Sequence, residues 1–210
     1  MAERCVWDGD QLPSGARKSV ALRRGARLCP RRNVSAMGTT DADVLLVVDM
    51  QRGLLTGPGA IPDAADVLAA VDRLVRSARD SGALIVHVQN DGTDGATDEP
   101  GAPGWALAIE PLAVEPVIRK RDDDAFAGTG LEAMLRERGA ASVVICGVQS
   151  EMCVAATARA AMQRGLVVVL PRDAHGTFPI PADAGGGVAV PVAQVARVAE
   201  WSLGDALVVT

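Results

Sequence analysis

Residues 143–154 of the chain read VVICGVQSEMCV, an apolar run followed by a short polar turn and then by a cysteine and further apolar residues. The run predicts a buried strand over 142–147, and the residues from 150 to 164 predict a helix that Gly165 ends. Cys153 is therefore expected at the start of a helix, where unpaired backbone N–H groups and the helix dipole favour a thiolate. This stretch predicts a strand, a turn and a helix that presents a nucleophilic sulfur.

Short apolar runs alternate with helical periods on both sides of this stretch. The expected strands are 44–48, 83–88, 117–119, 142–147, 166–170 and 206–209, and the expected helices are 63–80, 129–138, 150–164 and 190–203. Strands that are apolar throughout are covered on both faces, and their alternation with helices implies parallel pairing through right-handed crossovers. The sequence therefore predicts an α/β fold, a three-layer α/β/α sandwich with a mainly parallel sheet of about six strands.

Three polar residues follow strands of this predicted sheet. Asp49 comes directly after the first strand, Lys120 follows the third, and Cys153 opens the helix after the fourth. Because ligands bind beyond the carboxyl ends of the strands in such sheets, we expect these side chains to meet at one edge. This convergence is the main functional signal that the residues themselves provide.

A cysteine, a lysine and an aspartate in contact can act as nucleophile, cation and base. Asp49 would accept the thiol proton and return it to a leaving amine, and Lys120 would stabilise charge on the sulfur. Taken singly, each residue also has a structural explanation. Cys153 can be a small buried residue, Lys120 a solvated side chain and Asp49 a turn former. Their joint position favours attack by Cys153 on an amide-like carbonyl, a thioester intermediate and hydrolysis by water.

Composition narrows the classes of protein that the chain can belong to. The net charge of −5 argues against nucleic acid as a partner, and no apolar run approaches the roughly 18 residues of a membrane helix. The chain has four cysteines without C-x-x-C spacing and two histidines, so neither a metal nor another cofactor is expected. Free thiols favour a reducing, cytoplasmic setting. Lysine occurs only at positions 18 and 120, which suggests that Lys120 supplies what a guanidinium does not.

Residues 1–36 differ from the rest of the chain. They contain eight Arg and Lys residues against three Asp and Glu, and they show no sustained apolar period. Such a composition does not bury enough surface to order itself. We expect a disordered basic extension or translated upstream sequence, followed by one hydrolase-type domain over 37–210.

Other polar and aromatic residues have weaker claims. Trp105, directly after residues 90–104 of the long loop, is either a lid on the substrate or a hydrophobic anchor, and His175, past the fifth strand, either contacts substrate or anchors its loop. His87 and Cys146 lie inside predicted strands and are expected in the core. The acidic run 122–124 is interpreted as a solvated turn rather than a metal site.

Three motifs in order resemble the isochorismatase-like cysteine hydrolases, a superfamily that includes nicotinamidases, N-carbamoylsarcosine amidases and streptothricin hydrolases. They are VVDMQ at 47–51, RKRDDDAFAGT at 119–129 and GVQSEMCV at 147–154. The resemblance implies that Asp49 is the proton acceptor, Lys120 the second member of a triad and Cys153 the nucleophile. It also implies a cis peptide before Gln149 and an oxyanion hole made by the backbone N–H groups of Gln149 and Cys153.

Substrate assignments are less direct. Residues 62–65, PDAA, lack the histidine of the metal motif of nicotinamidases, which argues against a metal-dependent nicotinamidase. The 101–105 loop and the QSEMC turn look most like streptothricin hydrolases, so a small amide or lactam is the expected substrate. Candidate substrate contacts are Trp105, Phe126, Gln51 and His175. The resemblance also implies a homodimer or higher homo-oligomer.

Two alternatives stay open at this point. An isochorismatase-type ether hydrolase on the same scaffold would need Asp49 and not Cys153. A non-catalytic protein that binds a small ligand would carry an unreactive thiol.

Overall fold

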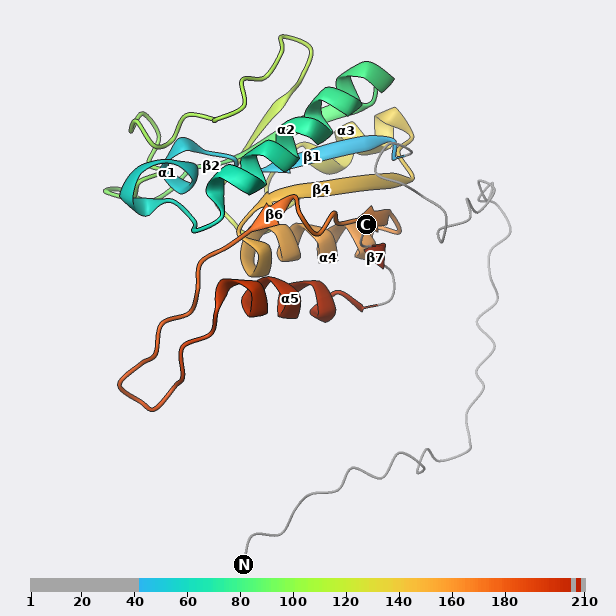
Figure 1. Cartoon of the computed structure of the whole chain (residues 1–210). Helices are drawn as coiled ribbons and strands as arrows, with labels where there is room; N and C mark the ends of the chain where they lie inside the picture. Colours follow the sequence, from blue (N-terminus) through green and yellow to red (C-terminus); the bar gives the residue numbers. More distant parts are fainter. Residues whose placement is uncertain (1–41, 205–206, 209–210) are drawn as a thin grey trace, which may run out of the picture. The chain divides into compact units, whose positions relative to one another are not determined.

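The computed structural model describes residues 42–204 and 207–208, which form one sheet with helices packed on it (Figure 1). The predicted basic extension 1–36 lies outside the described residues. The strands are β1 Val44–Val48, β2 Leu84–Asn90, β3 Val117–Lys120, β4 Ser142–Val148, β5 Val167–Val169, β6 His175–Gly176 and β7 Leu207–Val208. The helices are α1 Arg52–Leu55, α2 Ala64–Ser81, α3 Leu131–Arg138, α4 Ala155–Gln163 and α5 Val192–Ser202, with a 3-10 turn η2 Gly57–Gly59 and a π-helical turn η3 Ser150–Val154.

The sheet has the order β3-β2-β1-β4-β5-β7, and all neighbouring strands pair in parallel. The chain moves from β1 through β2 to β3 on one side and returns to continue with β4 and β5 on the other. The order therefore reverses between β1 and β4, and the crevice beyond their carboxyl ends is where such sheets bind ligands. The predicted parallel α/β sheet is confirmed.

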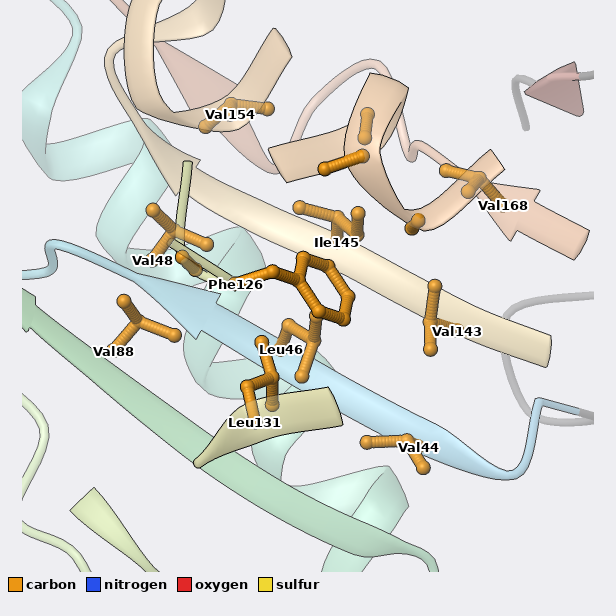
Figure 2. Packing of buried hydrophobic residues seen from close by; sticks show 14 of the residues in the cluster. Val44, Leu46, Val48, Val88, Phe126, Leu131, Val143, Ile145, Val154 and Val168 are labelled. Carbon is orange, nitrogen blue, oxygen red and sulfur yellow. The ribbon is translucent and has the colours of Figure 1, made fainter. Parts of the chain in front are cut away.

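The sheet is covered on both faces because its central strands are apolar throughout. Val44, Leu46 and Val48 of β1 point to one side, where α3 and α4 pack, and Figure 2 shows this cluster. Leu45 and Val47 point to the other side, into a second cluster with α2. Each fully buried aliphatic side chain contributes roughly 1.5–3 kcal/mol, so the two clusters are the main source of stability.

A glycine permits the close approach of β1 and β4 beside the crevice. Gly147 has φ +119, and a Cβ at this position would overlap the carbonyl oxygen of Val48. Only glycine tolerates both this backbone conformation and this contact. The absence of a side chain at Gly147 therefore allows the ends of β1 and β4, which lead to Asp49 and Gln149, to lie close together.

Two local predictions differ from the structure. The helix expected over 150–164 begins as the π-helical turn η3 and becomes regular only at Ala155, because Met152 has non-helical φ −102 and ψ −107. His175 was expected in a loop and instead lies in β6, which pairs with the end of β4. A strand of two residues is too short to produce an apolar run in the sequence.

In the part of the chain that the structure describes, every helix is too short or too polar to cross a bilayer.

Candidate active site

Asp49, Lys120 and Cys153 lie in contact at the predicted edge of the sheet. Lys120 Nζ lies 2.8 Å from Asp49 Oδ2 and donates a hydrogen bond to Cys153 Sγ over 3.1 Å. The Lys120 and Asp49 side chains are 0% and 3% exposed, so this ion pair is shielded from solvent. The expected meeting of the three side chains is confirmed.

The strand ends explain how the chain brings these groups together. Asp49 follows β1 with φ +49, an unusual value for a residue other than glycine, and Lys120 is the last residue of β3. Between them, Asn90 ends β2 in register with Lys120 and accepts a hydrogen bond from its ammonium group over 3.1 Å. Asn90 was not among the residues predicted from the sequence, although its place at a strand end was a usable signal.

Cys153 lies in the turn that joins β4 to α4. The peptide between Val148 and Gln149 is cis, as the family resemblance implied. The backbone N–H groups of Met152 and Val154 both donate to the carbonyl of Gln149 over 3.2 Å, which closes η3 around the sulfur. The assignment of the Gln149 and Cys153 N–H groups to an oxyanion hole stays a prediction.

The electrostatics of the site keep the proton on the sulfur. Burial raises the pKa of the Cys153 thiol, the charge of Asp49 raises it further, and Lys120 lowers it. The backbone N–H groups and the dipole at the helix start favour a thiolate, but burial is the largest influence on the pKa of this sulfur and favours the thiol. Attack by the sulfur then needs a base that takes its proton.

Asp49 has the properties of that base. Burial raises the pKa of its carboxyl group, and Lys120 opposes the shift. Burial acts to lower the pKa of Lys120, but the charge of Asp49 and the contact with Cys153 prevail and raise it, which favours the ammonium form. Among the described residues, the buried Asp49 Oδ1 has no hydrogen-bond partner, which leaves it available to accept a proton.

The buried side chain of Gln51 binds the backbone of Asn90 and of the long loop. Its amide nitrogen donates to the carbonyls of Asn90 and Trp105 over 3.1 and 3.0 Å, and its amide oxygen accepts from the N–H of Asn90 over 2.9 Å. The side chain is completely buried. The observed role of Gln51 is to fix Asn90 and the loop, and its contact with substrate stays a prediction.

Trp105 is anchored by both its backbone and its ring. Its carbonyl also accepts a hydrogen bond from Gln89, its indole N–H donates to Asp91 Oδ1 over 3.1 Å, and the Arg119 guanidinium lies 4.9 Å from the ring centroid. Arg119 and Asp91 in turn form a salt bridge of 2.8 Å. These contacts favour the anchor over the lid, and substrate contact by Trp105 stays a prediction.

Phe126 and His175 are buried, and their contact with substrate stays a prediction. Phe126 is 5% exposed and packs in the core, as Figure 2 shows, with the Arg164 guanidinium 4.4 Å from its ring centroid. His175 is also 5% exposed, and its Nδ1 lies 2.8 Å from the hydroxyl of Ser150 at the start of η3. Phe126 therefore has an observed packing role, and His175 supports the turn that carries the nucleophile.

A buried polar cluster lies behind His175. Its Nε2 lies 3.6 Å from Glu200 Oε1 on α5, and Glu200 is neutralised by Arg172 at 3.1 Å and Arg197 at 3.4 Å. Burial lowers the pKa of His175, although the charge of Glu200 opposes this. Ser150 and Glu200 were missed in the sequence, where neither has a motif or a strand end to mark it.

His87 and Cys146 are core residues, as predicted. His87 is 1% exposed and its Nε2 lies 3.0 Å from Glu115 Oε2, and Cys146 is completely buried in β4. Within residues 42–204 and 207–208, no three His, Cys, Asp or Glu side chains are grouped as ligands of a metal ion. The acidic run 122–124 contributes one unexpected contact, because Asp123 Oδ1 lies 3.5 Å from Cys153 Sγ.

Comparison with known proteins gives consistent matches. The model of the isochorismatase domain matches residues 43–185. A streptothricin hydrolase from Streptomyces noursei is 45% identical over 207 residues, which cover 96% of this chain and 81% of that protein. A second streptothricin hydrolase from the same organism is 52% identical over 163 residues, which cover 77% of this chain and 59% of that protein. The crystal structure of an isochorismatase from Pseudomonas putida KT2440 superposes with a TM-score of 0.75 at 31% identity, covering 83% of this chain and 89% of the other.

Proposed function

The chain belongs to the isochorismatase family of hydrolases, and from this premise we propose that it is a cysteine hydrolase that cleaves a C–N bond in a small amide or lactam. One observation carries the proposal: Lys120 Nζ contacts both Asp49, at 2.8 Å, and the sulfur of Cys153, at 3.1 Å. A base, a cation and a nucleophile are thus assembled in one shielded contact group.

The first half of the reaction forms a thioester. Asp49 takes the thiol proton as the sulfur of Cys153 attacks the carbonyl carbon, and the carbonyl oxygen becomes an oxyanion that the N–H groups of Gln149 and Cys153 would bind. The tetrahedral intermediate then collapses, the C–N bond breaks, and Asp49 returns its proton to the leaving nitrogen. Lys120 stays charged throughout and stabilises the developing thiolate.

The second half releases the acid. Asp49, again a carboxylate, takes a proton from water as the water oxygen attacks the thioester carbon. The C–S bond breaks and the sulfur of Cys153 recovers its proton from Asp49. Burial raises the pKa of Asp49 above that of a solvated aspartate. The buried carboxylate is therefore a stronger base toward the thiol and water protons that it accepts.

The substrate class follows from the relatives together with the site. The two relatives from Streptomyces noursei are named streptothricin hydrolases, which supports an amide or lactam substrate for this chain. We also propose that the protein is cytoplasmic, forms a homo-oligomer and works without a metal ion. A panel of streptothricin-type lactams, carbamoyl amines and nicotinamide is the direct way to identify the substrate.

The decisive experiment compares Cys153→Ala with Cys146→Ala on that panel. Both substitutions remove one thiol, but Cys146 is buried in β4 and serves as the matched control. We expect Cys153→Ala to abolish amide hydrolysis and Cys146→Ala to retain it. Amide hydrolysis that survives in Cys153→Ala would refute the thioester route. Ether hydrolysis that needs Asp49 and not Cys153 would favour the isochorismatase-type alternative, and slow labelling of Cys153 by iodoacetamide would favour a binding protein.

A further inference from the structure

Cys153 has charged neighbours of two different kinds. Asp49 and Lys120 are buried, with side chains 3% and 0% exposed, whereas Asp123 is exposed and its Oδ1 lies 3.5 Å from the same sulfur. The proposed mechanism uses the buried pair and gives no task to Asp123. An acidic side chain therefore borders the proposed nucleophile on the side that faces solvent.

The scaffold fixes the position of Asp123. Its backbone carbonyl accepts a hydrogen bond from the hydroxyl of Thr157 over 3.4 Å, and the same hydroxyl accepts from the N–H of Ala125 over 3.1 Å. Thr157 is completely buried in α4, the helix that follows the nucleophile turn. The N–H of Phe126 adds a bond of 2.8 Å to Asp124 Oδ1. Asp123 is thus tied to the same helix that positions Cys153.

The direction of the chemistry determines which part of a substrate meets Asp123. The leaving nitrogen must lie near Asp49, because it receives its proton there. The acyl group on the other side of the carbonyl carbon then extends away from the buried pair, toward the open side of the sulfur. A group on the first or second carbon of that acyl chain comes within reach of the Asp123 carboxylate when the carbonyl carbon is about 3–3.5 Å from the sulfur.

We propose that Asp123 is a specificity-determining residue that selects acyl groups carrying an ammonium group, or another hydrogen-bond donor, next to the scissile carbonyl. This inference rests on the proposed function and adds the charge of the substrate to it. A carboxylate accepts a strong charge-assisted hydrogen bond from an ammonium group and repels an anionic acyl group. Selectivity then arises from attraction of one class and repulsion of the other.

Two other roles fit the site less well. Asp123 as the catalytic base would duplicate Asp49, which is buried, paired with Lys120 and in contact with Cys153. Asp123 as a purely structural residue would use its carboxylate to hold the backbone, yet the bonds that fix this segment run through its carbonyl, Thr157 and Asp124. The carboxylate of Asp123 itself contacts the sulfur.

The test measures charge selection at the sulfur directly and does not depend on knowing the substrate. The full chain is treated with three methanethiosulfonates that carry a trimethylammonioethyl, a sulfonatoethyl or a neutral hydroxyethyl group. The rate of mixed-disulfide formation is read from the peptide that contains Cys153 by mass spectrometry. Each charged rate is divided by the neutral rate, which removes changes in the reactivity of the thiol itself. The variants are Asp123→Asn and, as a control with the same change of charge, Asp122→Asn.

We expect the wild-type protein to favour the cationic reagent over the anionic one, and Asp123→Asn to lower this preference about tenfold, a typical range for one nearby charge acting on both reagents. Asp122→Asn should change the preference by less than about twofold. A preference in Asp123→Asn equal to that of the wild type, or an equal loss in Asp122→Asn, would overturn the proposal. Failure of the proposed function would show separately, as amide hydrolysis that persists in Cys153→Ala.

Discussion

Replacing Lys120 with methionine keeps an unbranched side chain that is one heavy atom shorter and removes the cation that neutralises Asp49. The two side chains are 0% and 3% exposed, so solvent screens the loss only weakly. Breaking a buried pair by removing one partner typically costs about 3–5 kcal/mol of unfolding free energy. We therefore expect Lys120→Met to be strongly destabilised at neutral pH.

Asp49 can escape part of this cost by taking up a proton. From its ordinary pKa of 3.8, protonation costs about 4 kcal/mol at pH 7 and about 2 kcal/mol at pH 5, at 1.36 kcal/mol per pH unit. Burial already raises the pKa of Asp49, and loss of Lys120 raises it further, so the folded variant binds more protons than the unfolded chain. Its stability therefore falls as pH rises above about 4, and the loss relative to wild type is greater at pH 7 than at pH 5.

Urea unfolding followed by circular dichroism at pH 5 and pH 7 measures this effect. The double variant Lys120→Met with Asp49→Asn removes both charges, and we expect it to regain most of the lost stability and to show little dependence on pH. An equal loss at both pH values in Lys120→Met would refute the reasoning. A double variant as unstable as the single one would refute it too, since the cost would then not come from an unpaired Asp49.

Two further predictions concern stability away from the triad. Gly147→Ala should lower the free energy of unfolding by at least about 3 kcal/mol, because its Cβ meets the carbonyl of Val48 in a backbone conformation unfavourable to alanine. The control is Gly165→Ala, where φ is +81 and nothing lies near a Cβ. Thermal unfolding should show a much smaller loss of stability for this control. Glu115, whose hydrogen bond from Arg79 is the main cause that lowers its pKa to about 2, should stabilise the protein above pH 4.5 and lose this effect as pH falls toward 2. The stability difference between wild type and Glu115→Gln should therefore shrink over that range in acid titrations of unfolding, and a constant difference would count against the assignment.

The central strands and the meeting of Asp49, Lys120 and Cys153 were predictable because both follow from local pattern. The continuous apolar runs of β1 and β4 mark strands buried on both faces, and parallel pairing then places the residues after them at one edge. Asp49, Lys120 and Cys153 each sit at or just after such an end, so their meeting needs no detailed packing. Their distances of 2.8 and 3.1 Å match that expectation.

The surroundings of the triad were not predictable in the same way. Asp123 appeared as one of three acidic residues in a solvated turn, and nothing in that run distinguishes the one that reaches the sulfur. His175 appeared as a residue in a loop, but the short strand β6 turns it toward Ser150. Phe126 packs in the core with the Arg164 guanidinium near its ring, and its contact with substrate stays a prediction.

The sequence by itself determined the order of the strands and helices along the chain, and with it the edge where base, cation and thiol meet, because hydrophobic period and strand ends are local properties. Only the tertiary structure decided the charge state of that edge and the supports around it. Burial depends on which elements the crossovers pack against each side chain, so the raised pKa of Cys153, the buried Oδ1 of Asp49 and the contact of Asp123 with the sulfur are properties of the tertiary structure.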